Sequence, residues 1–223
     1  FGIGQADLMV LFGGSILCGA EVLARAMKEQ AARYYLIVGG EGHTTQTLRD
    51  EVHRQFPQID TAGKPEAEVF AGLLKARYGL RADFLECAST NCGNNITNLL
   101  ALIREKNLPS RSVILAQDAT MQHRMEAGLR KYVSGTTIIN FATYRARVCV
   151  REGELVFEHT PWGMWEMKRY LSLLMGEIPR LSDTAEGYGP RGKGFIAHVE
   201  IPPRVEQAFL ALKEDYGELV REA

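Results

Sequence analysis

Small and polar residues gather at four places in the sequence, each directly after a short apolar run. The four groups are Gly13-Gly14-Ser15, the run from Gly39 and Gly40 through Glu41 and His43 to Thr45, the run from Ser89 through Asn91 to Asn95, and Gln117-Asp118 with Arg124 in the helix that follows. Glycines have no Cβ, so they let backbone N–H groups approach a ligand, and a helix that begins behind such a loop adds positive partial charge. Hydroxyls can donate to phosphate or carboxylate oxygens, and the amides of Asn91, Asn95 and Gln117 suit a ribose or a base edge.

Two acidic side chains are the candidates for proton transfer. Glu66 follows Pro65, and Asp118 follows the fourth apolar run, so either could serve as a base or bind a ligand hydroxyl or amine. Ordinary helix starts also place proline first and acids in the first turn, and Gly, Ser, Thr and Asn are common in turns and caps. Four such loops at one edge of a single parallel sheet favour a ligand site over this alternative. Ser15 lacks the second flanking glycine of a nucleophile elbow and no Walker-type lysine follows the glycine pairs, so the residues alone predict binding without an assigned reaction.

The histidines and cysteines do not have the spacing of a metal site. The five histidines never pair at i,i+4 and the four cysteines include no C-x-x-C pair, so no zinc site is expected. His43 and His123 are isolated, which favours a surface or hydrogen-bonding role. Cys87 and Cys92 are expected to be inert, and all four cysteines are expected to be free thiols in a reducing compartment such as the cytoplasm.

The order of the segments predicts an α/β fold. Apolar runs alternate with segments of helical spacing, as they do in βαβ units. Strands are expected at residues 8–12, 34–38, 83–86, 112–116 and 136–141, and helices at residues 17–31, 45–55, 65–78, 95–105 and 121–132. The strands are almost entirely apolar, as in sheets that are covered on both faces. We therefore expect residues 1–141 to form a Rossmann-like, doubly wound parallel sheet of about five strands that binds its ligand beyond the carboxyl ends of the strands.

Beyond residue 141 the pattern changes. A hairpin is expected at residues 148–157, a helix at 162–175 and a last helix at 203–219, so residues 142–223 should form a small C-terminal α/β subdomain or cap. Trp162, Trp165 and Tyr170 crowd one helix; core or a homodimer contact is favoured over membrane binding, because charged residues interrupt the apolar face. The glycine-rich segment 187–195 contains Pro190 and follows no strand, so it fails as a dinucleotide fingerprint. It is expected either to close over an anion or to be a plain surface loop.

Composition excludes several classes of function. With 46% hydrophobic and 24% charged residues, the chain is typical of a soluble globular protein with one sizeable core. A net charge of −1 provides no general attraction to nucleic acid or to an anionic membrane. No apolar run reaches about 18 residues, so no membrane span is expected. The first strand lies close to Phe1, and we expect the natural chain to begin before that residue.

Several segments resemble one bacterial family. They are Gly13-Gly14, Val38-Gly39-Gly40-Glu41-Gly42-His43, Glu66-Ala67, Ser89-Thr90-Asn91-Cys92-Gly93-Asn94-Asn95, Gln117-Asp118-Ala119-Thr120-Met121-Gln122-His123-Arg124, and residues 169–174, 177–181 and 187–192. Over nearly the whole chain the sequence is similar to the YdcF-like family, a branch of the wider SanA/ElyC/YdcF domain of unknown function.

The resemblance implies a Rossmann-like sheet, a small C-terminal subdomain and binding of S-adenosylmethionine. The residues that recur in the family match Gly14, Gly40, Glu66, Ser89, Asn91, Asn95 and Arg124 in this sequence. Asn94 stands where the family usually has Glu. The glycine-rich turn that methyltransferases usually carry after the first strand is absent, so adenosyl binding would use residues 13–15 and 39–44 in another manner.

Three functions remain as alternatives. The first is binding of S-adenosylmethionine or a related nucleoside, with or without methyl transfer, in which Gly14, Gly40 and Asn91 supply close contacts while Glu66 and Asp118 bind ribose hydroxyls or the amino group. The second is an enzyme that handles an envelope-related phosphorylated sugar or lipid intermediate, with Glu66 or Asp118 as the base and Arg124 as the anion clamp. The third is a non-catalytic metabolite sensor.

Overall fold

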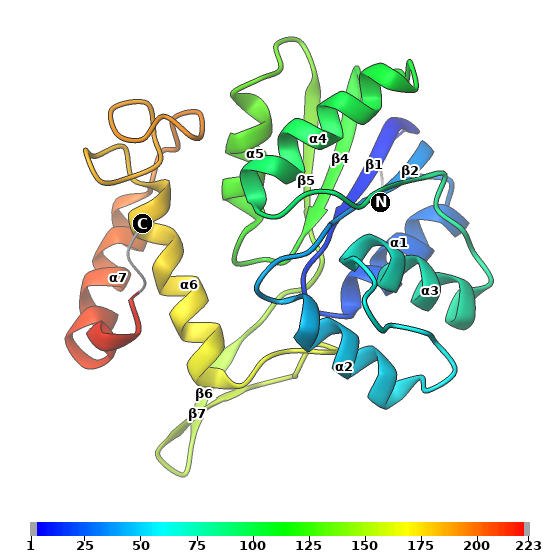
Figure 1. Ribbon diagram of the computed structural model, residues 1–223. Coiled ribbons are helices and arrows are strands. Elements are labelled where there is room, and N and C mark those ends of the chain that lie inside the picture. Colours follow the sequence, from blue (N-terminus) through cyan, green and yellow to red (C-terminus); the bar gives the residue numbers. More distant parts are fainter. Residues whose placement is uncertain (1–3, 221–223) are drawn as a thin grey trace. The chain divides into compact units, whose positions relative to one another are not determined.

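A five-stranded parallel sheet forms the centre of the fold (Figure 1). The computed structural model describes residues 4–220. The strands, in chain order, are β1 (Ala6–Phe12), β2 (Ala32–Val38), β3 (Phe84–Glu86), β4 (Ser112–Gln117) and β5 (Thr137–Ala142). Their order across the sheet is β3-β2-β1-β4-β5, and every pairing is parallel. The predicted Rossmann-like α/β class is therefore confirmed, and the strand order reverses direction between β1 and β4, where such sheets bind ligands.

Helices connect the strands in the expected alternation. They are α1 (Cys18–Lys28), α2 (Thr45–Gln55), α3 (Glu66–Tyr78), α4 (Cys92–Glu105) and α5 (Gln122–Arg130). The chain moves outward from β1 to β3 through α1 and α3, which pack against each other, and returns across the sheet through α4. Because such crossovers are right-handed, the return places α4 on the opposite face from α1 and α3.

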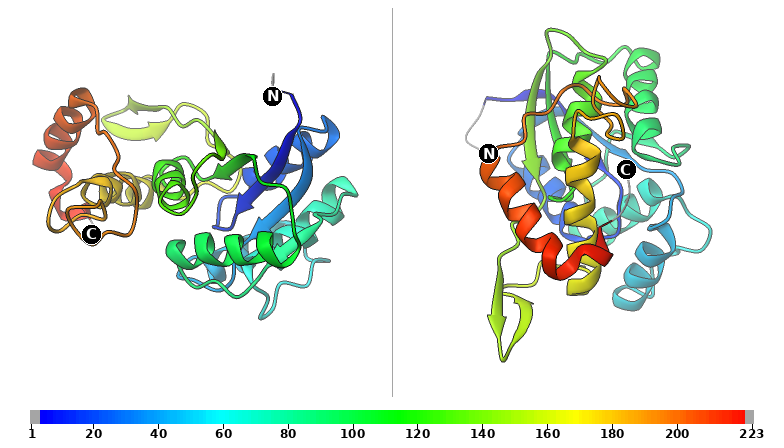
Figure 2. Two further views of the ribbon diagram at one scale, coloured as in Figure 1. Left: turned by 90° about the horizontal axis from the view of Figure 1, so that it is seen from above. Right: turned by 90° about the vertical axis from the view of Figure 1, so that its left-hand side faces the viewer.

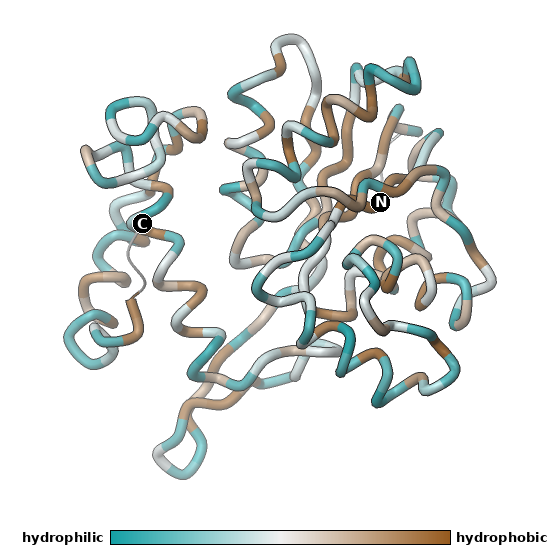
Figure 3. Tube along the Cα trace, viewed as in Figure 1, coloured by the Kyte–Doolittle hydropathy of each residue, from teal (hydrophilic) through white to brown (hydrophobic). Residues whose placement is uncertain are grey.

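The core is built from the central strands. Every residue of β1 except Asp7 is buried, and Figure 3 shows the inner strands as continuous hydrophobic segments. Leu23, Leu73 and Phe70 of the first-face helices pack in the same cluster. β5 lies at the edge of the sheet and is only partly buried. The carboxyl ends of β1, β2 and β4 are consequently held by a rigid framework.

Two compact units make up the chain. The sheet unit comprises the chain up to Ala119 together with Gly135–Arg145 and Pro161–Met164, and the C-terminal unit comprises Thr120–Ser134, Ala146–Thr160 and the chain from Trp165 on. The chain passes between them repeatedly, and the expected boundary at residue 141 stays a prediction, since compactness alone does not show which stretch folds by itself.

The C-terminal unit contains a hairpin and packed helices (Figure 2). The hairpin is β6 (Val148–Arg151) with β7 (Glu154–Phe157), and the helices are α5, α6 (Met167–Leu181) and α7 (Pro203–Tyr216), followed by a 3-10 turn at Gly217–Leu219. The ring of Phe157 packs on that of Tyr170, with centroids 5.1 Å apart. Within the described residues, no helix is long and apolar enough to cross a bilayer.

The glycine-rich segment of this unit is internally hydrogen-bonded. The Arg191 N–H donates to Asp183 Oδ1 at 2.7 Å, and the Lys193 N–H donates to the Gly187 carbonyl at 2.9 Å. A Cβ at Gly187 or Gly192 would overlap a backbone carbonyl oxygen. The glycines here serve close packing of the chain on itself. Closure over an anion and a plain surface loop both stay predictions.

The sheet unit also holds a short segment from late in the sequence. Trp162 packs edge-on against Phe56 with centroids 6.2 Å apart, and its indole N–H donates to Gln55 Oε1 at 2.7 Å. The Arg77 guanidinium lies 4.3 Å from the Trp162 ring centre, and the Trp162 carbonyl accepts from the Cys18 N–H at 3.1 Å. The prediction of a helix starting at residue 162 is therefore wrong: α6 begins at Met167 because Trp162 packs against the sheet unit.

Candidate functional site

The first turn of α3 sits on the carboxyl end of β2. The backbone N–H groups of Glu66 and Ala67 donate to the carbonyls of Gly40 and Gly39 at 2.9 and 2.8 Å. Pro65, whose missing N–H costs nothing at a helix start, directs the chain into this position. The Glu66 carboxylate is thereby carried to the ends of β1 and β2.

Glu66 is buried and tightly surrounded. Its Oε1 accepts from the hydroxyls of Thr44 and Thr45 at 3.0 and 2.9 Å, and a Cβ at Gly13 would overlap its Oε2. Burial raises the pKa of Glu66 above its ordinary value of 4.5, whereas the two hydroxyls and the charge of Arg49 lower it. Gly13 lacks a side chain because the carboxylate occupies that space.

The loops after β2 and β3 interlock at Gly40 and Ser89. The Gly40 N–H donates to Ser89 Oγ at 2.9 Å, and the Glu41 N–H donates to the Ser89 carbonyl at 3.0 Å. A Cβ at Gly40 would overlap the backbone of Ser89, which is itself almost fully buried. Ser89 therefore positions the Gly40 loop.

Glu86 holds the Ser89 loop in place, a role that sequence reasoning missed. Its Oε1 accepts from the N–H groups of Ala88 and Ser89 at 2.7 and 3.0 Å and from Asn98 Nδ2 at 3.0 Å. Its Oε2 is buried without a hydrogen-bond partner among the described residues. The signal in the sequence is an acid at the last position of a strand, directly before a turn.

Gln117 and Asp118 form the second part of the site, after β4. Gln117 Nε2 donates to the Gly13 carbonyl at 3.3 Å, and the Asp118 N–H donates to Gln117 Oε1 at 2.6 Å. The Tyr144 hydroxyl donates to Asp118 Oδ1 at 2.5 Å, a contact that the sequence does not indicate. Gly13 thus joins the two buried acids, Glu66 on one side and Asp118, through Gln117, on the other.

A small cavity lies beside this second part. Gly14, Gln117 and Asp118 are among its lining residues, and its volume is about 10 Å³, the space of roughly one water molecule. Gly14 has a φ of +154°, a conformation that residues with a side chain rarely adopt. A glycine is required here for the backbone conformation, whereas at Gly13 it is required for space.

The N–H groups of three predicted glycines are already used inside the protein. Gly13 donates to the Val38 carbonyl at 2.7 Å, Gly39 donates to the Glu86 carbonyl at 2.9 Å, and Gly40 donates to Ser89. The expectation that these glycine pairs offer N–H groups to a ligand is therefore not met at these positions. Their role is to let loops and the Glu66 side chain approach closely.

The asparagines lie at the start of α4. Asn91 is its N-cap: Oδ1 accepts from the Asn94 N–H at 3.0 Å, and Nδ2 donates to Asn94 Oδ1 at 2.9 Å. Asn95 lies within the first turn and is half-buried. The local capping role weighed for Asn91 is therefore present, and contact of either amide with a ligand stays a prediction.

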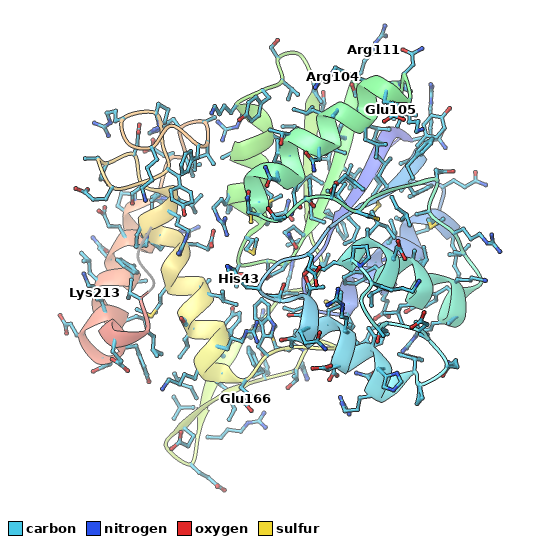
Figure 4. All side chains as sticks on the ribbon, viewed as in Figure 1. His43, Arg104, Glu105, Arg111, Glu166 and Lys213 are labelled. Carbon is cyan, nitrogen blue, oxygen red and sulfur yellow. The ribbon has the colours of Figure 1, made fainter. Side chains whose placement is uncertain are left out.

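The remaining predicted residues are distributed between the two units. Ser15 is buried, Glu41 pairs with Arg49 at 2.9 Å, and His43 is exposed on the β2–α2 loop (Figure 4). Arg124 belongs to the C-terminal unit, where it forms a two-pronged ion pair with Glu177: Nε to Oε2 at 2.6 Å and Nη2 to Oε1 at 2.8 Å.

In the part of the chain that the structure describes, no group of three or more His, Cys, Asp or Glu side chains is placed to hold a metal ion. No protein-family model matches the chain. The site offers two buried carboxylates with hydroxyl and amide neighbours, at the carboxyl ends of β1, β2 and β4.

Proposed function

We propose that the carboxyl edge of the sheet unit binds a nucleoside-like small molecule, with S-adenosylmethionine as the first candidate. The observation that carries the proposal is the pair of buried acids joined through Gly13, since Glu66 and Asp118 are less than a tenth exposed. Buried carboxylates accept hydrogen bonds from ribose hydroxyls or an ammonium group. They also favour a ligand with positive charge, such as a sulfonium.

The same contacts weigh against a phosphate ligand. A phosphate cradle needs unused backbone N–H groups, and those of Gly13, Gly39 and Gly40 already have acceptors. The expected anion clamp, Arg124, is paired with Glu177. A phosphate would in addition meet the charge of the two acids, and like charges in a site of low dielectric repel strongly.

One observation favours a second candidate, an enzyme in which Glu66 transfers a proton to or from a phosphorylated substrate. Burial raises the pKa of Glu66, and a carboxyl group whose pKa moves toward neutrality is better suited to general acid–base catalysis. The hydroxyls of Thr44 and Thr45 would orient Oε1 and leave Oε2 to the substrate.

The four cysteines support a proposal about the compartment. All four are free thiols in the structure, and Cys18 is buried. Free thiols persist where the environment is reducing, so we propose a cytoplasmic location. A homodimer, also allowed by the sequence, stays a proposal as well.

Thermal unfolding of the full chain with a ligand panel tests the first proposal. The panel contains S-adenosylmethionine, S-adenosylhomocysteine, ATP, UDP-sugars and inorganic phosphate. A ligand at about 100 times its dissociation constant adds roughly 2.7 kcal/mol, which raises the midpoint of a protein of this size by about 5–10 °C. We expect the midpoint to rise with S-adenosylmethionine and S-adenosylhomocysteine. This rise should be lost in Glu66→Gln. It should be kept in the control Glu68→Gln, which removes the same charge two residues away on α3.

The outcomes separate the alternatives. A shift with phosphorylated ligands only would overturn the adenosyl proposal and support the second candidate, to be followed by a phosphoester turnover assay. If S-adenosylmethionine raises the midpoint but no S-adenosylhomocysteine forms in the presence of methyl acceptors, the result would support the non-catalytic sensor. Retention of the shift in Glu66→Gln would move the site away from this carboxylate.

A further inference from the structure

A second cavity lies in the sheet unit, between the outer side of α1 and the end of β5. It has a volume of about 480 Å³, and α1 supplies one wall from Cys18 to Lys28. Residues 141–145 supply the other wall, and Tyr78 closes one side. Cavities of about 300–1,000 Å³ are the size that binds small organic molecules. None of the charged residues of α1 lines the small cavity beside Asp118.

The charge of this groove is predominantly positive. Three cations, Arg25, Lys28 and Arg145, line it together with one carboxylate, Glu21. Neither Lys28 nor Arg145 forms an ion pair within residues 4–220, and the Lys28 ammonium lies 5.6 Å from the centre of the Tyr78 ring. Cys18 contributes no negative charge near neutral pH, because burial raises the pKa of its thiol to about 11. The groove therefore has an excess of positive charge that an anion would neutralise.

The rest of the lining is apolar or aromatic, apart from Thr143. Val22, Ala24 and Phe141 offer aliphatic and ring carbon, and the rings of Tyr78 and Tyr144 add flat surfaces. The Tyr78 hydroxyl itself is buried, and the Arg77 guanidinium lies 5.6 Å from the centre of the Tyr78 ring. The ring of Tyr78, rather than its hydroxyl, is therefore the part that would meet a ligand.

We propose that this groove is a binding site for an organic anion with an apolar body, such as a carboxylate or phosphate ester of an aromatic or short aliphatic molecule. The anionic group lies between Lys28 and Arg145, and the body lies on Val22, Phe141 and the tyrosine rings. The groove shares Tyr144 with the proposed nucleoside site, where the Tyr144 hydroxyl donates to Asp118. Lys28 and Arg145 take no part in that site, so substituting them tests the groove separately.

A matched pair of probes tests the charge. In a ¹H–¹⁵N NMR titration of the full chain, 4-phenylbutyrate should shift the amide signals of α1 and of residues 141–145. Its uncharged amide, 4-phenylbutyramide, should bind about tenfold more weakly or less well still, since one charge-assisted hydrogen bond contributes on that order. Inorganic phosphate, which lacks the apolar body, should bind at least as weakly as the amide.

Matched double variants test the location. Lys28→Gln with Arg145→Gln, both at exposed positions, should weaken 4-phenylbutyrate about tenfold or more. Lys75→Gln with Arg81→Gln removes the same charge from exposed positions outside the groove and should leave the affinity unchanged. Any thermal shift with S-adenosylmethionine should be the same in both.

The proposal is overturned if 4-phenylbutyrate at millimolar concentration shifts no amide signals of the protein. It is also overturned if the amide signals that shift belong to residues outside the groove. Equal affinity for the amide, or equal weakening by the two double variants, would show a non-specific apolar or charge effect and would also reject it. If inorganic phosphate binds as tightly as 4-phenylbutyrate, the groove does not recognise an apolar body, and the proposal is rejected in that respect too.

Discussion

Glu66 makes the stability of this protein depend on pH in a particular direction. Its pKa in the folded chain is higher than the ordinary value of 4.5, so between these two pKa values the folded state binds more protons than the unfolded state. Stability contributed by the protonated carboxyl is fully present below 4.5 and is lost as the pH rises through the folded pKa.

Replacing Glu66 by Gln should remove this dependence. The amide keeps an oxygen acceptor for Thr44 and Thr45 but cannot ionise. We expect the difference in unfolding free energy between Glu66→Gln and the parent chain to grow in favour of the variant as the pH rises from 4.5. Urea unfolding at a series of pH values measures it. A difference that stays constant with pH would show that Glu66 is not perturbed.

Gly40 should tolerate no side chain. Its Cβ would overlap the Ser89 backbone, which cannot move without breaking the hydrogen bonds to Glu86. Gly40→Ala should therefore cost about 3 kcal/mol of unfolding free energy or more. Gly42→Ala in the same loop, whose Cβ would lie 3.6 Å from the Thr90 carbonyl, is the control and should change stability little. Equal effects in chemical denaturation would contradict this packing.

At the level of elements, α4 depends on its cap. Asn91 accepts from the Asn94 N–H at 3.0 Å, and losing such a cap usually costs about 1 kcal/mol. Asn91→Ala should therefore lower the unfolding free energy by about that amount, whereas Asn91→Ser should keep most of it. If ligand binding falls in both variants while stability recovers only in the serine variant, Asn91 contacts the ligand as well.

The elements that local pattern determines were predicted closely. The strands at 8–12, 34–38 and 112–116 lie within the observed β1, β2 and β4, because strands that are buried on both faces are continuous apolar runs. The predicted start of α4, residue 95, lies three residues after the observed start at Cys92, because polar residues that can cap a helix follow one another from Ser89 to Asn95. The predicted end of α6, residue 175, is too early, because the helix contains Pro179 and continues to Leu181.

The site was predictable only in part, because its contacts join residues that are far apart in the sequence. Chain order alone places the loops after β1, β2 and β4 at one edge of the sheet. It does not show that Gly13 is required by the Glu66 carboxylate, or that Tyr144 binds Asp118. These contacts join residues 26 or more positions apart, and no periodicity in the sequence records them.

At the scale of the whole molecule, a residue from late in the chain, Trp162, packs into the sheet unit and stabilises it. Trp162 binds Gln55, Phe56 and Arg77, and its carbonyl accepts from the first residue of α1. Trp162→Ala should cost about 2–4 kcal/mol, less than a fully buried tryptophan because Trp162 is half-buried. Hydrogen exchange should rise at the start of α1 and the end of α2, and a rise confined to α6 would contradict the packing.

A fragment that ends at residue 141 should fold poorly. It lacks Tyr144, the partner of Asp118, and Trp162, the cap of the start of α1. We expect its circular dichroism to show a broad thermal transition well below that of the full chain. A sharp transition at the parent midpoint would instead establish residues 1–141 as an independent domain.

The return of Pro161–Met164 to the sheet unit also sets the order of events during synthesis. Domains usually fold as they leave the ribosome, from the N-terminus onward. Here the first four strands and α1 to α4 emerge early, but the start of α1 gains its acceptor only when Trp162 follows. The hairpin β6–β7, which belongs to the other unit, is translated in between. During synthesis the Cys18 N–H therefore lacks its acceptor until residues 146–160 of the C-terminal unit have already been made.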